Sequence, residues 1–192
     1  MTMLFTSLWV RETSKPMSIH LNVFCLTCQA TSNKESQMEI PITIRQATLS
    51  DLKEMLAIEE ANPSLEEALS RQSLEESIRK TAGTFLVAGD ENQLLGYVLG
   101  EAQYLHPKWI EIKSLTIHPD HWGQGLGTLL LAALKQVTVE LDYQGILLQS
   151  PDELLSYFEM NGFVEEEVTG SQYDSGSEWY LIWGNPFYQE EI

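Results

Sequence analysis

One stretch constrains the fold of this chain more than any other: a strand-like run, a turn rich in glycine and an apolar helical run follow one another directly. We expect the strand over 109–117 and the helix over 127–139, where apolar residues recur at helical spacing. Between them stand Gly123, Gly125 and Gly127. Glycine has no β-carbon, so backbone N–H groups there can approach a ligand closely. The first N–H groups of a helix are also unpaired and favour negative charge, so the turn predicts a pyrophosphate site.

Two common phosphate-binding loops do not match this turn. A Walker loop ends in Gly-Lys-Ser/Thr, whereas Gly127 is followed directly by Thr128. A dinucleotide fingerprint reads Gly-x-Gly-x-x-Gly after the first strand, whereas this turn reads Gly-x-Gly-x-Gly after the fourth. A tight strand–helix turn without a ligand is the other interpretation of the pattern.

The surrounding pattern mixes strands with helices, which indicates a single α/β (α+β) domain. Thr48 and Asp51 have the spacing of a helix cap, Asn62 with Pro63 should end that helix, and Gly162 should end the last one. A helix that begins at Ser64 or Ser73 should end at Lys80. We expect strands over 40–45, 84–88, 94–101, 109–117, 145–149, 163–168 and 178–183. We expect one helix that begins at Thr48, a second that ends at Lys80, a third over 127–139 and a fourth over 152–161.

Composition and charge narrow the class of partner. At 192 residues and 43% hydrophobic content, the chain has room for one domain, which we expect over 38–192 behind a flexible leader over 1–37. The net charge is −17 and the leader has three basic and two acidic residues, so the acidity belongs to the domain. Such a field repels nucleic acid and attracts cationic amines, although it could also serve solubility alone.

Neither a membrane span nor a metal site is expected. No apolar run approaches the roughly 18 residues that a spanning helix needs. Cys25 and Cys28 form a lone Cys-x-x-Cys without a second ligand pair, and we interpret them as incidental thiols. A reducing, cytoplasmic location is the default for such a chain.

The run from His118 to Gly127 (His-Pro-Asp-His-Trp-Gly-Gln-Gly-Leu-Gly) resembles the acetyl-CoA-binding motif of the GNAT superfamily of N-acetyltransferases. The resemblance extends over about 40–183: the run from Ile44 to Asp51 looks like the family's opening strand and helix, and Gly162-Phe163 like the end of its late helix. Within the family, the second half looks most like the arylalkylamine (serotonin-type) branch. The resemblance implies a mixed, mostly antiparallel central sheet, splayed at the fourth strand, with helices on both faces.

The resemblance also implies how acetyl-CoA is held, with no metal ion. Main-chain groups of Leu115 and Ile117 would hold the pantetheine arm. Trp122 departs from the family, which usually has Arg or Gln there, but the backbone cradle does not need that side chain. The pyrophosphate would be held by the turn and helix start, whose cofactor-binding residues are Trp122, Gly123, Gln124, Gly125, Gly127 and Thr128.

The catalytic residues follow the family less closely. Attack on a thioester needs a base for the amine and an acid for the departing thiolate. Glu111 and Lys113 stand where the resembled branch has two histidines, and Glu111 is either a base or a solvated strand residue. The family's acid is a tyrosine at the position of Phe158. Either the adjacent Tyr157 reaches the sulfur after a local shift, or no side chain protonates the thiolate.

We therefore expect an N-acetyltransferase that moves the acetyl group of acetyl-CoA to a small cationic primary amine by direct attack. A protein lysine or N-terminal acetyltransferase, and an acyl-CoA-binding module without turnover, are the alternatives. No nucleic acid or membrane partner is expected, and a homodimer stays open. Aromatic residues near the C-terminus could line an acceptor pocket, but packing between strands is favoured: Tyr173, Trp179, Tyr180, Trp183, Phe187 and Tyr188.

Overall fold

The computed structural model describes residues 41–62, 69–81, 83–165 and 178–189. The expected leader, with its Cys-x-x-Cys, lies outside these residues, as do Pro63, Ser64, Tyr173 and the Trp179 side chain. Of the strand expected over 163–168, the structure describes the part up to Glu165.

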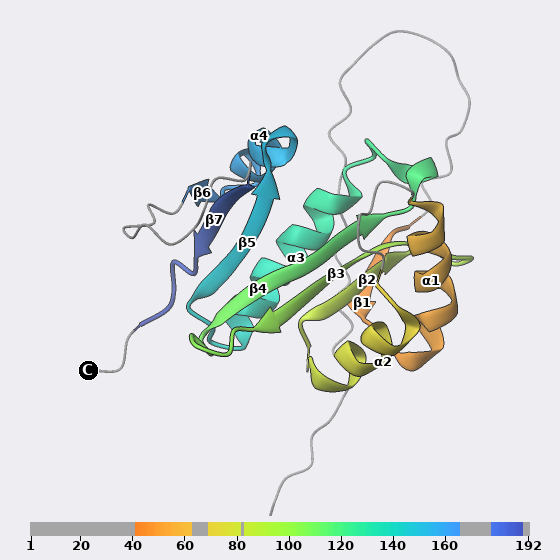
Figure 1. Cartoon of the computed structure of the whole chain (residues 1–192), viewed down its shortest axis with the longest axis horizontal. Helices are drawn as coiled ribbons and strands as arrows, with labels where there is room; N and C mark the ends of the chain where they lie inside the picture. The colour runs from red at the N-terminus through yellow and green to blue at the C-terminus, as the bar shows by residue number, and fades with distance from the viewer. Residues whose placement is uncertain (1–40, 63–68, 82, 166–177, 190–192) are drawn as a thin grey trace, which may run out of the picture.

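The core of the molecule is one seven-stranded sheet with the order β1-β2-β3-β4-β5-β7-β6 (Figure 1). It matches the expected α/β architecture, and the strand ends differ from the predictions by a few residues. The strands are β1 (Thr43–Gln46), β2 (Phe85–Gly89), β3 (Leu94–Ala102), β4 (Trp109–Ile117), β5 (Gly145–Pro151), β6 (Val164–Glu165) and β7 (Glu178–Gly184).

The sheet is antiparallel except where β4 meets β5. These two strands are parallel and pair only from Trp109 with Gly145 to Glu111 with Leu147. Beyond that point β4 runs on to Ile117 and β5 to Pro151, and the two visibly diverge (Figure 1). The splay expected at the fourth strand is therefore present, and it opens toward the carboxyl ends of both strands.

A bulge in β4 changes which side chains share a face of the sheet. Ser114 is opposite Leu99, and Ile112 is opposite the next residue of β3, so Lys113 is the extra residue. A bulged residue shifts the alternation of the strand by one position. As a result Ile112 and Leu115 both pack on the same side of the sheet.

Helices cover both faces of the sheet, as Figure 1 shows. The long helix α3 (Leu126–Glu140) and the short α4 (Leu155–Met160) belong to one hydrophobic cluster, and α1 (Leu52–Ala61) and α2 (Arg71–Lys80) to the other. In the described residues, short 3₁₀ turns precede α1, α3 and α4: they are η1 (Leu49–Asp51), η2 (Pro119–His121) and η3 (Asp152–Leu154). The buried side chains around α3 include Ile44, Leu86, Val98, Ile110, Leu130, Leu134, Ile146, Phe158 and Leu181, and those under α1 and α2 include Met55, Ile58, Leu74, Phe85, Val87, Tyr97 and Leu99.

Most of the predicted helix boundaries are confirmed. Thr48 and Asp51 form the expected capping box, and α1 ends before Asn62. Gly162 follows α4 with a φ of 77°, in the left-handed region that favours glycine. Helix α2 begins at Arg71, two residues before the nearer of its two expected starts, because the hydroxyl of Ser70 accepts the backbone N–H of Ser73 and caps the helix there.

Candidate cofactor and catalytic site

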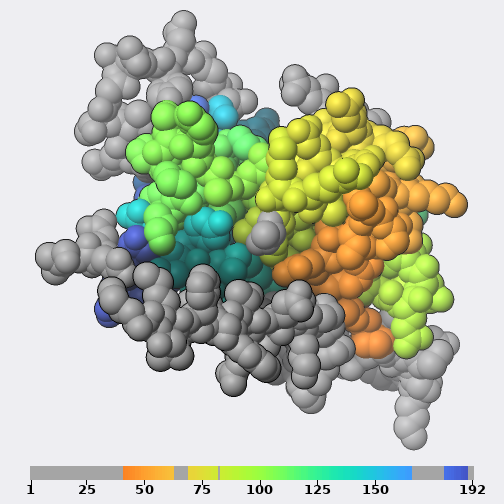
Figure 2. Space-filling view, turned by 90° about the horizontal axis from the view of Figure 1, so that it is seen from below, coloured from red at the N-terminus to blue at the C-terminus, as the bar shows by residue number. Residues whose placement is uncertain are grey.

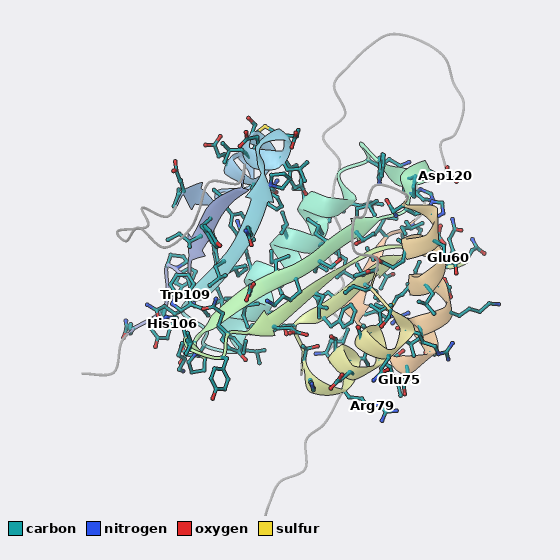
Figure 3. All side chains as sticks on the ribbon, in the orientation of Figure 1. Glu60, Glu75, Arg79, His106, Trp109 and Asp120 are labelled. Carbon is teal, nitrogen blue, oxygen red and sulfur yellow. The ribbon has the colours of Figure 1, made fainter. Side chains whose placement is uncertain are left out.

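The glycine turn between β4 and α3 has the geometry of an open backbone cradle. Gly123 and Gly125 have φ values of 75° and 79°, which a residue with a β-carbon rarely adopts. Gly125 is the N-cap of α3 and no side chain caps this helix, so the first N–H groups of α3 have no helical partner. Figure 3 labels Asp120, which lies in the 3₁₀ turn just before the cradle, and Trp109, which begins β4 at the other end of that strand.

The space beside the cradle fits an anionic group. A β-carbon placed on Gly123 or Gly125 would meet no other atom within 4 Å. No lysine or arginine occurs in the sequence between Ser114 and Leu134, so backbone N–H groups and the dipole of the fifteen-residue helix α3 are the main positive groups that this segment supplies. These features suit a pyrophosphate bound mainly through the main chain.

Trp122 ties this turn to the end of β4. Its side chain is 57% exposed, and its indole N–H donates to the carbonyl of Ile117 at 2.8 Å. The side-chain amide of Asn62 donates to the same carbonyl at 3.3 Å. The Ile117 carbonyl, which the family resemblance assigns to the pantetheine arm, therefore already accepts two hydrogen bonds from this chain.

The hydroxyl of Tyr157 reaches the start of α3 without any shift of α4. It is buried and forms no hydrogen bond with the described residues, and it lies against Gly127. Burial raises the pKa of Tyr157, and the nearby Thr128 hydroxyl acts in the opposite direction. A buried hydroxyl without a well-formed hydrogen bond is unusual in proteins and calls for an explanation.

Phe158, at the position of the family's acid, takes a structural role here. Its ring is 6% exposed and packs edge-on against Phe163, with the centroids 5.8 Å apart. Phe158 belongs to the hydrophobic cluster around α3. The two neighbours on α4 therefore divide the tasks, since Phe158 fills the core while Tyr157 points toward the cradle.

Glu111 lies at the point where β4 and β5 begin to separate. Its neighbour Ile110 packs toward α3, so Glu111 is on the opposite face, beside α1 and α2. It forms an ion pair with Lys113 at 2.6 Å, with side chains 29% and 42% exposed. In the β3–β4 register it is opposite Glu101, whose carboxylate accepts the Ser77 hydroxyl of α2 at 3.0 Å. Figure 2 shows α2 beside the turn that joins β3 and β4.

The sequence interpretation missed Glu59 and Tyr97, which form a buried polar pair on the same face. Glu59 is 4% exposed and Tyr97 fully buried, and the tyrosine hydroxyl donates to the carboxylate. Burial raises the pKa of Tyr97, and the hydrogen bond to Glu59 raises it further. The available signal was that Glu59 follows Met55 by four residues, on the apolar face of α1.

Among the C-terminal aromatic residues whose side chains are described, Trp183 packs against the core as the favoured interpretation predicts, whereas Phe187 is 74% exposed and does not. Trp183 lies 5.0 Å from the Lys135 amine, on the α3 side of the sheet. Among the described residues, no group of three or more His, Cys, Asp or Glu side chains could hold a metal ion. None of the described helices is long and apolar enough to span a bilayer.

Comparison with solved structures finds the same fold in many proteins. PaiA N-acetyltransferase from Thermoplasma acidophilum, solved with coenzyme A, has a TM-score of 0.61 at 16% identity, covering 74% of this chain and 98% of that one. YncA from Salmonella typhimurium, solved with acetyl-CoA, has a TM-score of 0.61 at 15% identity, and the match covers 78% of this chain and 96% of that one. The ribosomal-protein-S18-alanine N-acetyltransferase from Escherichia coli has a TM-score of 0.59 at 16% identity, and the match covers 78% of this chain and 96% of that one.

Comparison of sequences gives a match at the level of the family. No match was found among curated proteins. The profile of the acetyltransferase (GNAT) family matches residues 49–163, which is more than half of the chain and includes the cradle, Glu111 and Tyr157. The arylalkylamine-type branch remains a prediction, because the match is to the family as a whole. With the splayed sheet and the open glycine turn, this match shows that the chain belongs to the acetyltransferase (GNAT) family.

Proposed function

We propose that this acetyltransferase moves the acetyl group of acetyl-CoA to a small cationic primary amine by direct attack. The observation that carries the proposal is the pairing of an open backbone cradle with the unpartnered, buried Tyr157 hydroxyl at the same helix end. Group transfer to an amine uses an acid near the thioester, because the leaving thiolate takes up a proton, and the Tyr157 hydroxyl is our candidate for that acid.

The cofactor would enter where β4 and β5 separate. The cradle residues 122–128 would bind its pyrophosphate through backbone N–H groups, as the open space beside Gly123 and Gly125 supports. Main-chain groups of Leu115, on the free edge of β4 beyond Glu111, would hold the pantetheine arm. Acetyl-CoA supplies the activated acetyl group.

The acceptor amine would approach from the face that carries α1 and α2. Glu101 and Glu111 are opposite each other there, and Lys113 offsets part of their charge. Two carboxylates and a strongly acidic chain favour a cation over an anion at this face. We assign to Glu111 the removal of the first proton, which turns the ammonium group into a nucleophile, and to Tyr157 the delivery of a proton to the sulfur.

A second candidate is acetylation of a protein N-terminus or lysine. It is favoured by the likeness to the ribosomal-protein-S18-alanine N-acetyltransferase, which shares the fold at 16% identity. An N-terminal amine is also cationic, so charge alone does not separate the two acceptors. A comparison of free amines with peptides does so directly.

The first test is titration of acetyl-CoA into the purified chain by calorimetry. We expect micromolar binding by the wild type, weaker binding by Gly125→Ala and none by Gly125→Glu. Both variants strain the same left-handed backbone, so the difference between them measures the effect of the longer, negatively charged side chain at the cradle. Gly162→Ala imposes a similar strain far from the cradle and should bind normally.

The second test is release of free CoA with a panel of polyamines, aryl-ethylamines and short peptides. Turnover with free amines and not with peptides supports the proposal, and the reverse supports the protein acceptor. Acetyl-CoA binding without release above background would show a binding module without turnover. Absence of binding by the wild type would refute the proposed cofactor site.

A further inference from the structure

Helix α4, which carries the candidate acid Tyr157, is too short to hold its own position. It has six residues, from Leu155 to Met160. Isolated helices shorter than about 12–15 residues are marginally stable in water. The direction of the Tyr157 hydroxyl therefore depends on the contacts that α4 makes with the rest of the chain.

One of these contacts is apolar. The buried ring of Phe158 belongs to the hydrophobic cluster around α3 and packs edge-on against Phe163. This packing holds α4 against the core. The hydrophobic effect is not directional, however, so burial of one ring does not by itself fix the C-terminal end of the helix.

The C-terminal end of α4 is held by Lys135 of α3. The Lys135 amine donates a hydrogen bond to the carbonyl of Asn161, the C-cap residue of α4. The last carbonyls of a helix have no helical partner, and a lysine side chain can satisfy one of them. The same amine lies 4.7 Å from the ring centre of Phe163 and 5.0 Å from that of Trp183, at cation–π distances.

The surroundings of Lys135 indicate that its amine serves this contact. Lys135 is half-buried, and no carboxylate of the described residues forms an ion pair with it, although the chain has 28 acidic against 11 basic residues. Burial lowers the pKa of Lys135, because removal from water disfavours its charged form. An apolar side chain of similar length would fill the same space without this cost. The donor to the Asn161 carbonyl is what such a side chain would lack.

Asn161 connects this contact to the main chain of Tyr157. Its side-chain amide donates to the Tyr157 carbonyl at 2.8 Å, and its backbone N–H donates to the same carbonyl at 3.2 Å. The Tyr157 hydroxyl in turn lies against Gly127, about two turns before Lys135 on α3. Helix α3 therefore contacts the hydroxyl of Tyr157 at one point and, through Asn161, holds its main chain at another.

We propose that Lys135 is a positioning residue that keeps the Tyr157 hydroxyl beside the cradle through Asn161. Lys135 acts on the position of α4 and not on the reacting atoms. Without its hydrogen bond the C-terminal end of α4 is free to shift, and the hydroxyl moves relative to the departing sulfur. A misplacement of about 1 Å can cost up to about 100-fold in rate. The proposal rests on the proposed function of the same site, in which Tyr157 delivers a proton to the thiolate.

The kinetic experiment compares Lys135→Met, Lys135→Arg and Asn161→Ala with the wild type, using the best amine of the panel. We expect Lys135→Met and Asn161→Ala to lower kcat about 10-fold, with the Kd for acetyl-CoA changed less than about twofold. Lys135→Arg keeps a cationic donor, so its kcat should stay within about threefold of the wild type. In a Tyr157→Phe background, Lys135→Met should have no further effect on kcat, because the hydroxyl that Lys135 positions is absent.

Lys108 provides the matched control. Its amine also lies over a tyrosine ring, 5.9 Å from the centre of Tyr188, and 3.5 Å from the carbonyl of Asp142. Lys108 directly precedes β4, whereas the cradle follows the other end of that strand. Lys108→Met should therefore keep full kcat.

A second experiment tests the positioning without any substrate. Gly127→Ala places a methyl group where the Tyr157 hydroxyl lies, so it should lower the denaturant midpoint of the chain. If Lys135 holds the hydroxyl there, Lys135→Met lets it move away from the new methyl group. We expect Gly127→Ala to lower the midpoint less in the Lys135→Met background than in the wild type, and by the full amount in the Lys108→Met background.

The other outcomes overturn the proposal in different ways. A folded Lys135→Met with kcat within about twofold of the wild type would overturn the positioning and leave the proposed function standing. Equal losses of kcat with and without the Tyr157 hydroxyl would show that Lys135 acts through general stability. If Lys135→Met does not fold, Asn161→Ala undergoes the same comparisons with the same expected results. No turnover by the wild type would refute the proposed function, and equal midpoint losses from Gly127→Ala in both backgrounds would refute the positioning.

Discussion

The hydroxyl oxygen of Tyr157 lies 2.5 Å from the point where a β-carbon on Gly127 would stand. Residue 127 is inside α3 and its φ is not positive, so glycine is not needed there for its backbone freedom. The close approach of the tyrosine explains the residue instead. The third glycine of the turn thus makes room for the candidate acid, whereas the first two allow the left-handed backbone.

This contact predicts that substitutions at Gly127 and Tyr157 have non-additive effects on the free energy of unfolding. Gly127→Ala alone should destabilise the chain by about 1–3 kcal/mol, because the new methyl group collides with the hydroxyl. In a Tyr157→Phe background the same change should be neutral or stabilising by up to about 1 kcal/mol, since alanine favours helix over glycine. Denaturant unfolding of the four proteins measures the coupling, with Gly184→Ala as the control at an uncrowded glycine. Equal effects of Gly127→Ala in both backgrounds would contradict the contact.

Removal of the Tyr157 hydroxyl should slow the chemical step and spare binding. Because burial raises the pKa of Tyr157, its proton is present at neutral pH and available to the thiolate. We expect Tyr157→Phe to lower kcat about 100-fold or more with an unchanged Kd for acetyl-CoA. Steady-state kinetics and calorimetry check the two parts, and Tyr188→Phe should behave as the wild type. A normal kcat would mean that the Tyr157 hydroxyl does not protonate the sulfur.

The bidentate ion pair between Asp51 and Arg45 predicts an acid-sensitive element of stability. Burial alone would raise the pKa of Asp51, but the hydrogen bonds from Arg45 and Thr48 outweigh it and the pKa is lowered. Stability from such a group is present above the unfolded value of about 3.9 and is lost as pH falls through the lower folded value. Asp51→Asn should therefore cost about 1–3 kcal/mol at pH 7, and progressively less below about pH 4.

Denaturant unfolding at several pH values tests this prediction. Glu60→Gln, at an exposed carboxylate on α1 that Figure 3 labels, should change stability by less than about 0.5 kcal/mol at any pH. A difference between Asp51→Asn and the wild type that does not shrink in acid would show that the side chain acts through packing.

The net charge of −17 predicts opposite effects of salt on the two substrates. Salt screens the attraction between the acidic chain and a cationic amine, so raising NaCl from about 20 to about 300 mM should raise the KM for the amine. The same screening relieves repulsion between the chain and the phosphates of acetyl-CoA, so its Kd should stay constant or fall. Kinetics and calorimetry over the same salt series measure both. An amine KM that does not respond to salt would argue against a cationic acceptor.

The sequence by itself determined the cradle, the order of elements and most helix boundaries. These features depend on local causes: glycines in a strand–helix turn, a capping box at Thr48, a helix stop at Asn62 and the period of the apolar side chains. Local causes act between residues close in the chain, so their effect can be predicted before the fold is known. The capping box predicted at Thr48 and Asp51 is present in the structure for this reason.

Only the tertiary structure decided which side chains meet at the site. Whether Tyr157 or Phe158 points to the cradle depends on how α4 packs against the core beneath it. The bulge at Lys113 depends on the register between β3 and β4, and it alone puts Ser114 on the face of Glu111. Glu59 and Tyr97 are 38 residues apart, and no local pattern pairs them. Side-chain direction and long-range pairing follow from packing, and packing is a property of the whole fold.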